Sequence, residues 1–64
     1  MTLKQLITGM TAKEPIRIFA GCQTIYMGNV PDSNNKEWNL KVLPYMHCNV
    51  VNCKAINGTI AISI

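Results

Sequence analysis

The sequence predicts a small α+β domain, in which an N-terminal helix packs on a largely antiparallel four-stranded sheet made of two β-hairpins. Three observations lead to this prediction. An amphipathic segment opens the chain, and two stretches of alternating apolar and polar residues follow, each divided by a two-residue turn. The 64 residues suffice for one domain, residues 1–64, and contain no internal repeat.

The N-terminal helix is expected to begin at Leu3. Thr2 and Gln5 have the spacing of a capping box, in which each side chain bonds to the backbone N–H of the other residue. Apolar residues then recur at the i, i+3, i+4 and i+7 spacing of one helical face: Leu3, Leu6, Ile7 and Met10. This face should pack on the sheet.

The first hairpin is predicted around Gly21-Cys22, because glycine in the first turn position supplies the positive φ of a type II′ turn. Counting outward from this turn assigns Ile16, Ile18, Ile25 and Met27 to the core face. The same register places Arg17 opposite Tyr26 and Phe19 opposite Thr24 on the other face. That second face combines a cation with aromatic rings, and so it is a candidate binding surface.

The second hairpin is predicted around Asn57-Gly58, a dipeptide typical of a type I′ turn. The turn sets four pairs: Ile56 with Thr59, Ala55 with Ile60, Cys53 with Ile62, and Val51 with Ile64. One face is then apolar, and the other carries Asn52, Lys54, Thr59, Ala61 and Ser63. The whole predicted core is Leu3, Leu6, Ile7, Met10, Ile16, Ile18, Ile25, Met27, Val51, Cys53, Ile60 and Ile62.

Residues 34–43 fit two structures. Asn34 and Glu37 have the spacing to cap a short helix that Pro44 would end. Apolar residues at 38, 40 and 42 alternate with polar ones, which is typical of a strand. We favour a short helix or an irregular segment, because a strand here would have to continue through Pro44.

Composition indicates self-association. Hydrophobic residues make up 48% of the chain and charged residues only 14%, against about 25% charged in an average globular protein. A chain this short has little volume in which to hide its apolar side chains, and a homo-oligomer is therefore expected. The net charge of +3 comes from scattered cations, which leaves an anionic partner open without indicating a dedicated nucleic-acid patch.

The start of the chain lacks the pattern of a signal peptide, and no segment approaches the roughly 20 apolar residues of a membrane span. The cysteines, Cys22, Cys48 and Cys53, are odd in number and cannot all pair within one chain. The simplest expectation is a cytoplasmic protein with free thiols and no membrane association.

No catalytic, cofactor-binding or metal motif is found. His47, Cys48 and Cys53 are the only cluster of metal-ligand types, but the spacing between the cysteines sends them to opposite faces of a strand. The three carboxylates, Glu14, Asp32 and Glu37, form no pair that could orient His47. We therefore expect no enzyme activity, no cofactor and no metal.

The candidate binding residues are the cation and the large aromatic side chains: Arg17, Phe19, Tyr26, Trp38 and Tyr45. If they converge on one side, they would contact a base, a nucleotide or a partner protein. For Trp38, a buried position that anchors the central segment to the core is the default interpretation, and the binding role is the alternative.

The order of these signals resembles small accessory proteins encoded by bacteriophages, prophages and related mobile elements. The similarity covers nearly the whole chain. It lies in a start like residues 1–7, a strand like residues 16–19, a strand that ends at a glycine like Gly28, a loop like Val30-Pro31 and a closing hairpin. The polar loop around Ser33-Asn34-Asn35 departs from that pattern.

The resemblance implies a non-enzymatic protein of the host cytosol that binds and blocks a host defence component, either an effector protein or a nucleotide signal. Two other functions are consistent with the residues themselves. One is a single-stranded nucleic-acid or nucleotide binding module that uses Arg17, Phe19, Tyr26 and nearby lysines. The other is a structural or assembly subunit whose exposed apolar surface contacts further copies.

Overall fold

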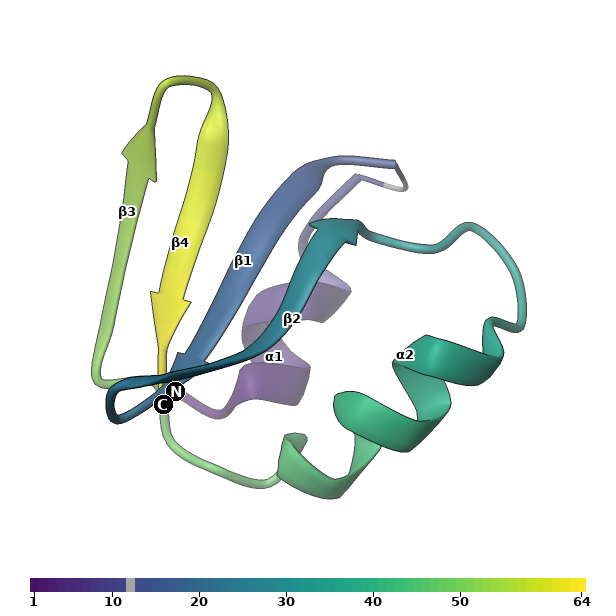
Figure 1. Ribbon diagram of the computed structural model, residues 1–64, viewed down its shortest axis with the longest axis horizontal. Coiled ribbons are helices and arrows are strands. Elements are labelled where there is room, and N and C mark those ends of the chain that lie inside the picture. Colours follow the sequence, from purple (N-terminus) through teal and green to yellow (C-terminus); the bar gives the residue numbers. More distant parts are fainter. Residues whose placement is uncertain (12) are drawn as a thin grey trace.

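The computed structural model describes residues 1–11 and 13–64, which form two helices, a 3-10 turn and four strands (Figure 1). In chain order the elements are α1 (Leu3–Thr8), β1 (Pro15–Ala20), β2 (Gln23–Asn29), α2 (Lys36–Lys41), η1 (Leu43–Tyr45), β3 (Asn52–Ile56) and β4 (Thr59–Ser63). The chain therefore has the predicted α+β composition, with an N-terminal helix of six residues.

The four strands form one mixed sheet in the order β2-β1-β4-β3. The two predicted hairpins, β1–β2 and β3–β4, are both present and antiparallel. They join through a parallel pairing of β1 with β4, in which Ile16 lies beside Ile60 and Ile18 beside Ile62. This parallel pair is the departure from the predicted, largely antiparallel arrangement. It is possible because α2 and β3 lie in the long connection between β2 and β4, which allows the chain to cross over.

α1 begins at Leu3, and the predicted capping box is confirmed. The Gln5 N–H donates to Thr2 Oγ1 over 3.2 Å, and the Thr2 N–H donates to Gln5 Oε1 over 2.9 Å. The next two N–H groups bond outside the helix, from Leu3 to the carbonyl of Cys48 and from Lys4 to that of Met46. The segment before β3 is thereby attached to the start of α1.

The ambiguous central segment contains the short helix α2. Its N-cap is Asn35, one residue later than the predicted Asn34, and the Asn35 side chain accepts a hydrogen bond of 3.0 Å from the Trp38 N–H. Asn34 instead accepts a hydrogen bond from the Asn39 side chain. The alternation at residues 38, 40 and 42 therefore does not mark a strand, because Trp38 and Val42 are one helical turn apart and both are buried.

The core lies between the helices and one face of the sheet. Its buried members are Leu3, Ile16, Ile18, Tyr26, Val30, Trp38, Val42 and Ile62. Of the other predicted core residues, five pack against this cluster while partly buried: Leu6, Ile7, Met10, Ile25 and Ile60. The core extends towards α2: Trp38 occupies the buried position expected of it by default, whereas Val30 and Val42 were not predicted to be core residues.

Three residues predicted for the core are exposed. Val51 is 80% exposed because it precedes the edge strand β3. Cys53 lies in β3 and is also exposed, because a groove separates it from α1. Cys53 does share the inner face with Ile62, as its register predicted. Met27 is 62% exposed for a different reason, which lies in the register of the first hairpin.

The predicted register of the first hairpin is wrong beyond its turn. Phe19 does pair with Thr24, but the register then shifts, so that Ile18 pairs with Tyr26 and Arg17 with Met27. Ile25 is the extra residue of this bulge. Because side chains alternate along a strand, one inserted residue exchanges the faces of everything after it. Tyr26 consequently points into the core, and Met27 points to solvent beside Arg17.

Tyr26 and Trp38 form an edge-to-face pair that joins the sheet to α2. Their ring centroids are 5.1 Å apart with an interplanar angle of 88°, and each residue is only 7% exposed. The Tyr26 hydroxyl donates a 2.9 Å hydrogen bond to the carbonyl of Asn29. Burial raises the pKa of this phenol, and the negative charge of Glu37 raises it further.

Candidate functional site

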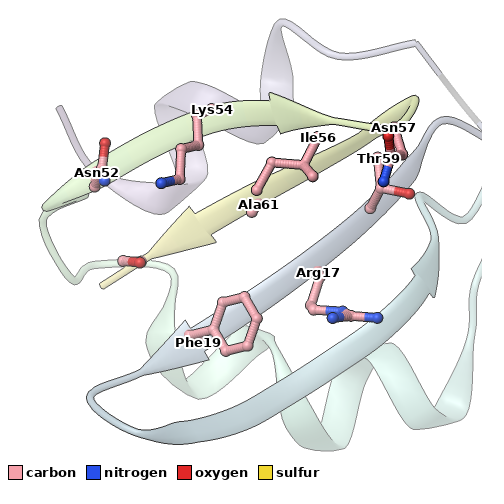
Figure 2. Close-up of a pocket in the computed structure, with 9 residues that line it drawn as sticks. Arg17, Phe19, Asn52, Lys54, Ile56, Asn57, Thr59 and Ala61 are labelled. Atoms are coloured by element: carbon pink, nitrogen blue, oxygen red, sulfur yellow. The ribbon is translucent and has the colours of Figure 1, made fainter.

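The face of the sheet opposite the helices carries a groove, which we call the open-face groove (Figure 2). Its volume is ≈ 350 Å³. Nine residues from β1, β3, β4 and the β3–β4 turn line it: Arg17, Phe19, Asn52, Lys54, Ile56, Asn57, Thr59, Ala61 and Ser63. The groove thus spans the junction between the two hairpins.

The groove follows from the sizes of the side chains that alternate outward. β4 contributes only small residues, Thr59, Ala61 and Ser63, and these form the floor. The neighbouring strands contribute longer side chains, with Arg17 and Phe19 on β1 and Asn52, Lys54 and Ile56 on β3. A strand of small residues between two strands of larger ones leaves a trough along its length, and Figure 2 shows the wall residues on either side of β4.

Arg17 is positioned by its neighbours on the same face. Its Nη2 lies 3.1 Å from the Met27 sulfur, and its Cζ lies 6.0 Å from the centroid of the Phe19 ring. Both are weak interactions for a cation, so the guanidinium keeps most of its capacity to donate hydrogen bonds to a ligand. The bulge at Ile25 makes this possible, because it turns Met27 outward beside Arg17.

A second cation, Lys54, lies across the floor from Arg17. Arg17 pairs with Ala61, and Ala61 pairs with Lys54, so the three residues form one row across β1, β4 and β3. Two strand spacings separate the two backbones, which is roughly 10 Å. An anion in the groove would therefore lie between two positive charges.

Among the residues that the structure describes, no carboxylate side chain lines the groove. Asp32 pairs with Lys13 over 3.7 Å, Glu37 lies near Tyr26 on the helical side, and Glu14 lies near α1. Within residues 1–11 and 13–64, no ion pair involves Arg17 or Lys54. The open face is therefore more positive than the net charge of +3 alone would indicate.

Polar groups along the groove supply hydrogen bonds of both kinds. The side-chain Oδ1 of Asn52 accepts from the Cys53 N–H over 2.9 Å, which leaves the Asn52 Nδ2 hydrogens as donors. Ser63 and Thr59 add hydroxyl groups to the floor, and Asn57 adds an amide at the turn. Such groups can pair with the edge of a base or with a sugar hydroxyl.

The predicted binding residues fall into three places. Arg17 and Phe19 are together in the open-face groove, whereas Tyr26 and Trp38 are together in the core. Tyr45 is 37% exposed and lies on η1, where it lines a separate hollow with Leu40 and the first residues of β2. The five residues do not converge on one surface.

The sequence did not identify the residues that β3 and β4 contribute to the groove. Asn52, Lys54, Thr59, Ala61 and Ser63 were assigned to a solvent-facing side of the second hairpin, and the structure places them there. What sequence reasoning missed is that β1 pairs with β4, which joins this side to the side that carries Arg17 and Phe19. The alternating pattern of each hairpin was the available signal.

In the part of the chain that the structure describes, no group of three or more His, Cys, Asp and Glu side chains comes together as a metal site. Cys22, Cys48 and Cys53 are exposed free thiols. None of the described helices is long and apolar enough to cross a membrane.

Comparisons with protein-family models, with curated proteins and with solved structures each found no match to this chain.

Proposed function

We propose that this chain is a non-enzymatic binding protein whose open-face groove holds a nucleotide or a short segment of single-stranded nucleic acid. The observation that carries the proposal is the composition of the groove. It combines two cations, an aromatic ring and polar side chains, and none of the described residues that line it carries a carboxylate side chain. Phosphate and a nucleobase are together the ligand chemistry that this combination fits.

Each part of such a ligand has a counterpart in the groove. Arg17 and Lys54 provide positive charge on both sides of the floor, where a phosphate would be attracted. Phe19 stands on the β1 wall and offers a ring on which a base can stack. The small side chain of Ala61 leaves room between them. A flat, open sheet face also suits a single strand better than a rigid duplex.

This activity agrees with one of the functions implied by the resemblance to phage and mobile-element accessory proteins. A protein that sequesters a nucleotide signal of host defence needs a binding groove and no catalytic group. We place the open-face groove in that role. Blocking an effector protein would instead require a protein-binding surface, for which Tyr45 and Leu40 are the exposed candidates.

Binding can be tested by fluorescence anisotropy with a labelled oligothymidylate, with a duplex of equal length and with unlabelled mononucleotides as competitors. We expect the single strand to bind more tightly than the duplex. If two phosphates are neutralised, log K should fall against log salt with a slope of about −1.4. Competition by a mononucleotide would indicate a nucleotide as the ligand, and its absence would indicate a strand.

Two charge variants test the site itself. Arg17→Gln and Lys54→Gln should each weaken binding and make the salt slope less steep by about 0.7, because each removes one phosphate contact. Lys36→Gln is the matched control, since it removes the same charge from α2, outside the groove. Equal losses in all three variants would point to general electrostatic attraction and contradict the proposed site.

Two further variants leave these charges intact. Ala61→Leu should abolish binding, because the larger side chain fills the floor of the groove from its outward side without entering the core. Phe19→Leu should reduce the affinity by a factor corresponding to about 1–3 kcal/mol, the contribution of one stacked base. Unchanged affinity in Ala61→Leu would exclude the groove as the binding site.

A further inference from the structure

β3 is an edge strand with no described element beside it, as Figure 1 shows for the outer side of the sheet. All five of its residues are exposed. On the helical side, the neighbouring surface is a second groove of ≈ 510 Å³ between α1 and the inner face of the second hairpin. Five of the residues that line this groove have apolar or sulfur-containing side chains: Met1, Leu6, Met10, Cys53 and Ile60. The edge is therefore open along its backbone and beside an apolar surface.

The turn of this hairpin determines which backbone groups face outward. In a two-residue hairpin, the pair that flanks the turn, here Ile56 and Thr59, exchanges hydrogen bonds within the hairpin, and alternate residues follow. Cys53 and Ala55 therefore direct their N–H and C=O groups away from β4. The Cys53 N–H agrees with this assignment, because it bonds to the Asn52 side chain and not to β4. The Ala55 N–H donates no such hydrogen bond to a described side chain.

We propose that β3 pairs with β3 of a second copy of this chain, antiparallel and centred on Lys54. In this register Cys53 of each copy lies opposite Ala55 of the other. The outward N–H and C=O groups of both residues then form four hydrogen bonds across the two-fold axis. The two sheets become one continuous sheet, with all helices on one face and both open-face grooves on the other.

Registers shifted by one residue are less favourable for hydrogen bonding between the two copies. Centring on Cys53 would bring in Val51, but the Val51 N–H already donates to the Ser63 carbonyl over 2.7 Å. Centring on Ala55 would bring Asn57 into the ladder, although Asn57 is a turn residue with a φ of 51°. The register centred on Lys54 uses only groups that point away from β4. Of these, the Cys53 N–H exchanges its local bond to the Asn52 side chain for a backbone carbonyl of the second copy.

A second copy fits this edge better than an anionic ligand does. The backbone pattern is self-complementary about Lys54. Among the described residues, the adjoining groove is lined mainly by apolar and neutral side chains together with one carboxylate, Glu14, and by no Lys or Arg side chain. Because 48% of the residues are hydrophobic, burial of this groove against a second copy is also favourable.

This pairing brings two Lys54 side chains together on the open face, where their like charges oppose association. An anion bound between them would relieve that repulsion, so dimerisation and anion binding should be coupled. This linkage rests on the proposed function, whereas the pairing itself does not. Lys54→Gln should therefore tighten the dimer about threefold without any ligand, since it removes the like-charge pair.

The test is analytical ultracentrifugation of the wild-type chain and its variants over a range of protein concentrations. We expect a weak, reversible dimer in the wild-type chain. Ala55→Pro should abolish it, because proline removes an outward N–H while sparing the β3–β4 ladder. Ala55→Ser is the matched control, since it keeps that N–H and should still dimerise. A monomeric wild type with a monomeric Lys54→Gln variant, or a dimeric Ala55→Pro variant, would overturn the pairing.

A cross-link tests the register. With Cys22 and Cys48 replaced by serine, Ala55→Cys should form an oxidised dimer, because the new thiol lies opposite Cys53 of the second copy at about 5.5 Å between Cα atoms. Oxidised dimers that form equally well without this substitution would instead indicate a register centred on Cys53, and would contradict the one proposed.

Sodium triphosphate tests the coupling between anion binding and dimerisation separately from the β3–β3 pairing itself. It should strengthen the wild-type dimer and have little effect on Lys54→Gln. If it strengthens neither while Ala55→Pro and Lys54→Gln behave as expected, the edge pairing stands and anion binding at the open face fails. If oligothymidylate binds the groove but no variant dimerises, the proposed function stands and the pairing fails.

Discussion

Tyr26 connects the sheet with α2 through its ring and connects two parts of its own strand through its hydroxyl. The ring meets Trp38 edge to face, and the hydroxyl donates to the carbonyl of Asn29. Neither contact was predicted, because the assumed register put Tyr26 on the solvent face. One bulged residue, Ile25, decides this, and nothing in the local pattern distinguishes Ile25 from an ordinary strand residue.

The hydroxyl of Tyr26 should make the free energy of unfolding decrease at alkaline pH. Burial raises its pKa in the folded state above the ordinary value of 10.0. The folded state therefore holds the proton more tightly than the unfolded chain. The resulting stabilisation is complete below pH 10 and is lost as the pH rises through the higher, folded-state pKa. Urea unfolding of Tyr26→Phe should lack this component, and at neutral pH it should show a loss of about 1 kcal/mol for the missing hydrogen bond.

The control for this experiment is Tyr45→Phe, which removes the hydroxyl of a partly exposed ring on η1. It should keep the decline in stability seen in the wild-type chain above pH 10. If Tyr26→Phe declines as steeply as Tyr45→Phe, Tyr26 is not the group responsible.

Among the elements, the β3–β4 hairpin was the most predictable from sequence. Asn57 and Gly58 have φ values of 51° and 80°, as a type I′ turn requires, and the pairs from Ile56–Thr59 to Cys53–Ile62 are those that the turn predicted. The turn sets this register locally, and no bulge intervenes. The first hairpin has an equally clear turn at Gly21, but its register changes between Ile18 and Phe19.

The β3–β4 turn and the C-cap of α1 each contain a glycine, and the substitution of these two residues can be compared. Gly58→Ala should destabilise the protein by about 1–2 kcal/mol, because alanine must adopt a left-handed conformation there, although no atom lies within 4 Å of the added Cβ. Gly9→Ala should instead be neutral or stabilise by up to about 1 kcal/mol, since Gly9 has a φ of −84° and the new Cβ meets only an ordinary contact.

Thermal unfolding followed by circular dichroism measures both changes. A destabilisation of Gly9→Ala as large as that of Gly58→Ala would show that the sign of φ does not control the result.

For the molecule as a whole, the parallel β1–β4 pair is the decisive contact, because it joins the two hairpins into one sheet. It was not predicted, since alternating patterns reveal which face of a strand is buried but not which strand lies beside it. The candidate site shows the same limit. Arg17 and Phe19 were identified from their own hairpin, while Lys54 and Asn52 reach the same groove only through this pairing.

If the β1–β4 pair makes the two hairpins one cooperative unit, a cavity created in β4 should destabilise the whole protein. Ile62 is fully buried beside Ile18. Ile62→Ala should cost about 2–5 kcal/mol, which is comparable to the roughly 3–10 kcal/mol expected for a 64-residue domain. Ile62→Val should cost about 0.5–1.5 kcal/mol and remain folded at room temperature.

Trp38 fluorescence reports on this experiment, because Trp38 is the only tryptophan and belongs to α2, away from β4. The fluorescence and circular dichroism transitions of Ile62→Val should coincide and should both shift to lower urea concentration. A Trp38 transition that is unaffected by Ile62→Val would show that the two hairpins unfold independently.

The alternation of side chains in β1, β3 and β4 also separates what keeps the protein folded from what its open face can recognise. Arg17 and Phe19 interleave with the buried Ile16 and Ile18, so a substitution at one set need not disturb the other. The open face can therefore vary during evolution, or be randomised in a library, at little cost in stability. The chain is in this sense a 64-residue scaffold whose ligand can be exchanged while its core is kept.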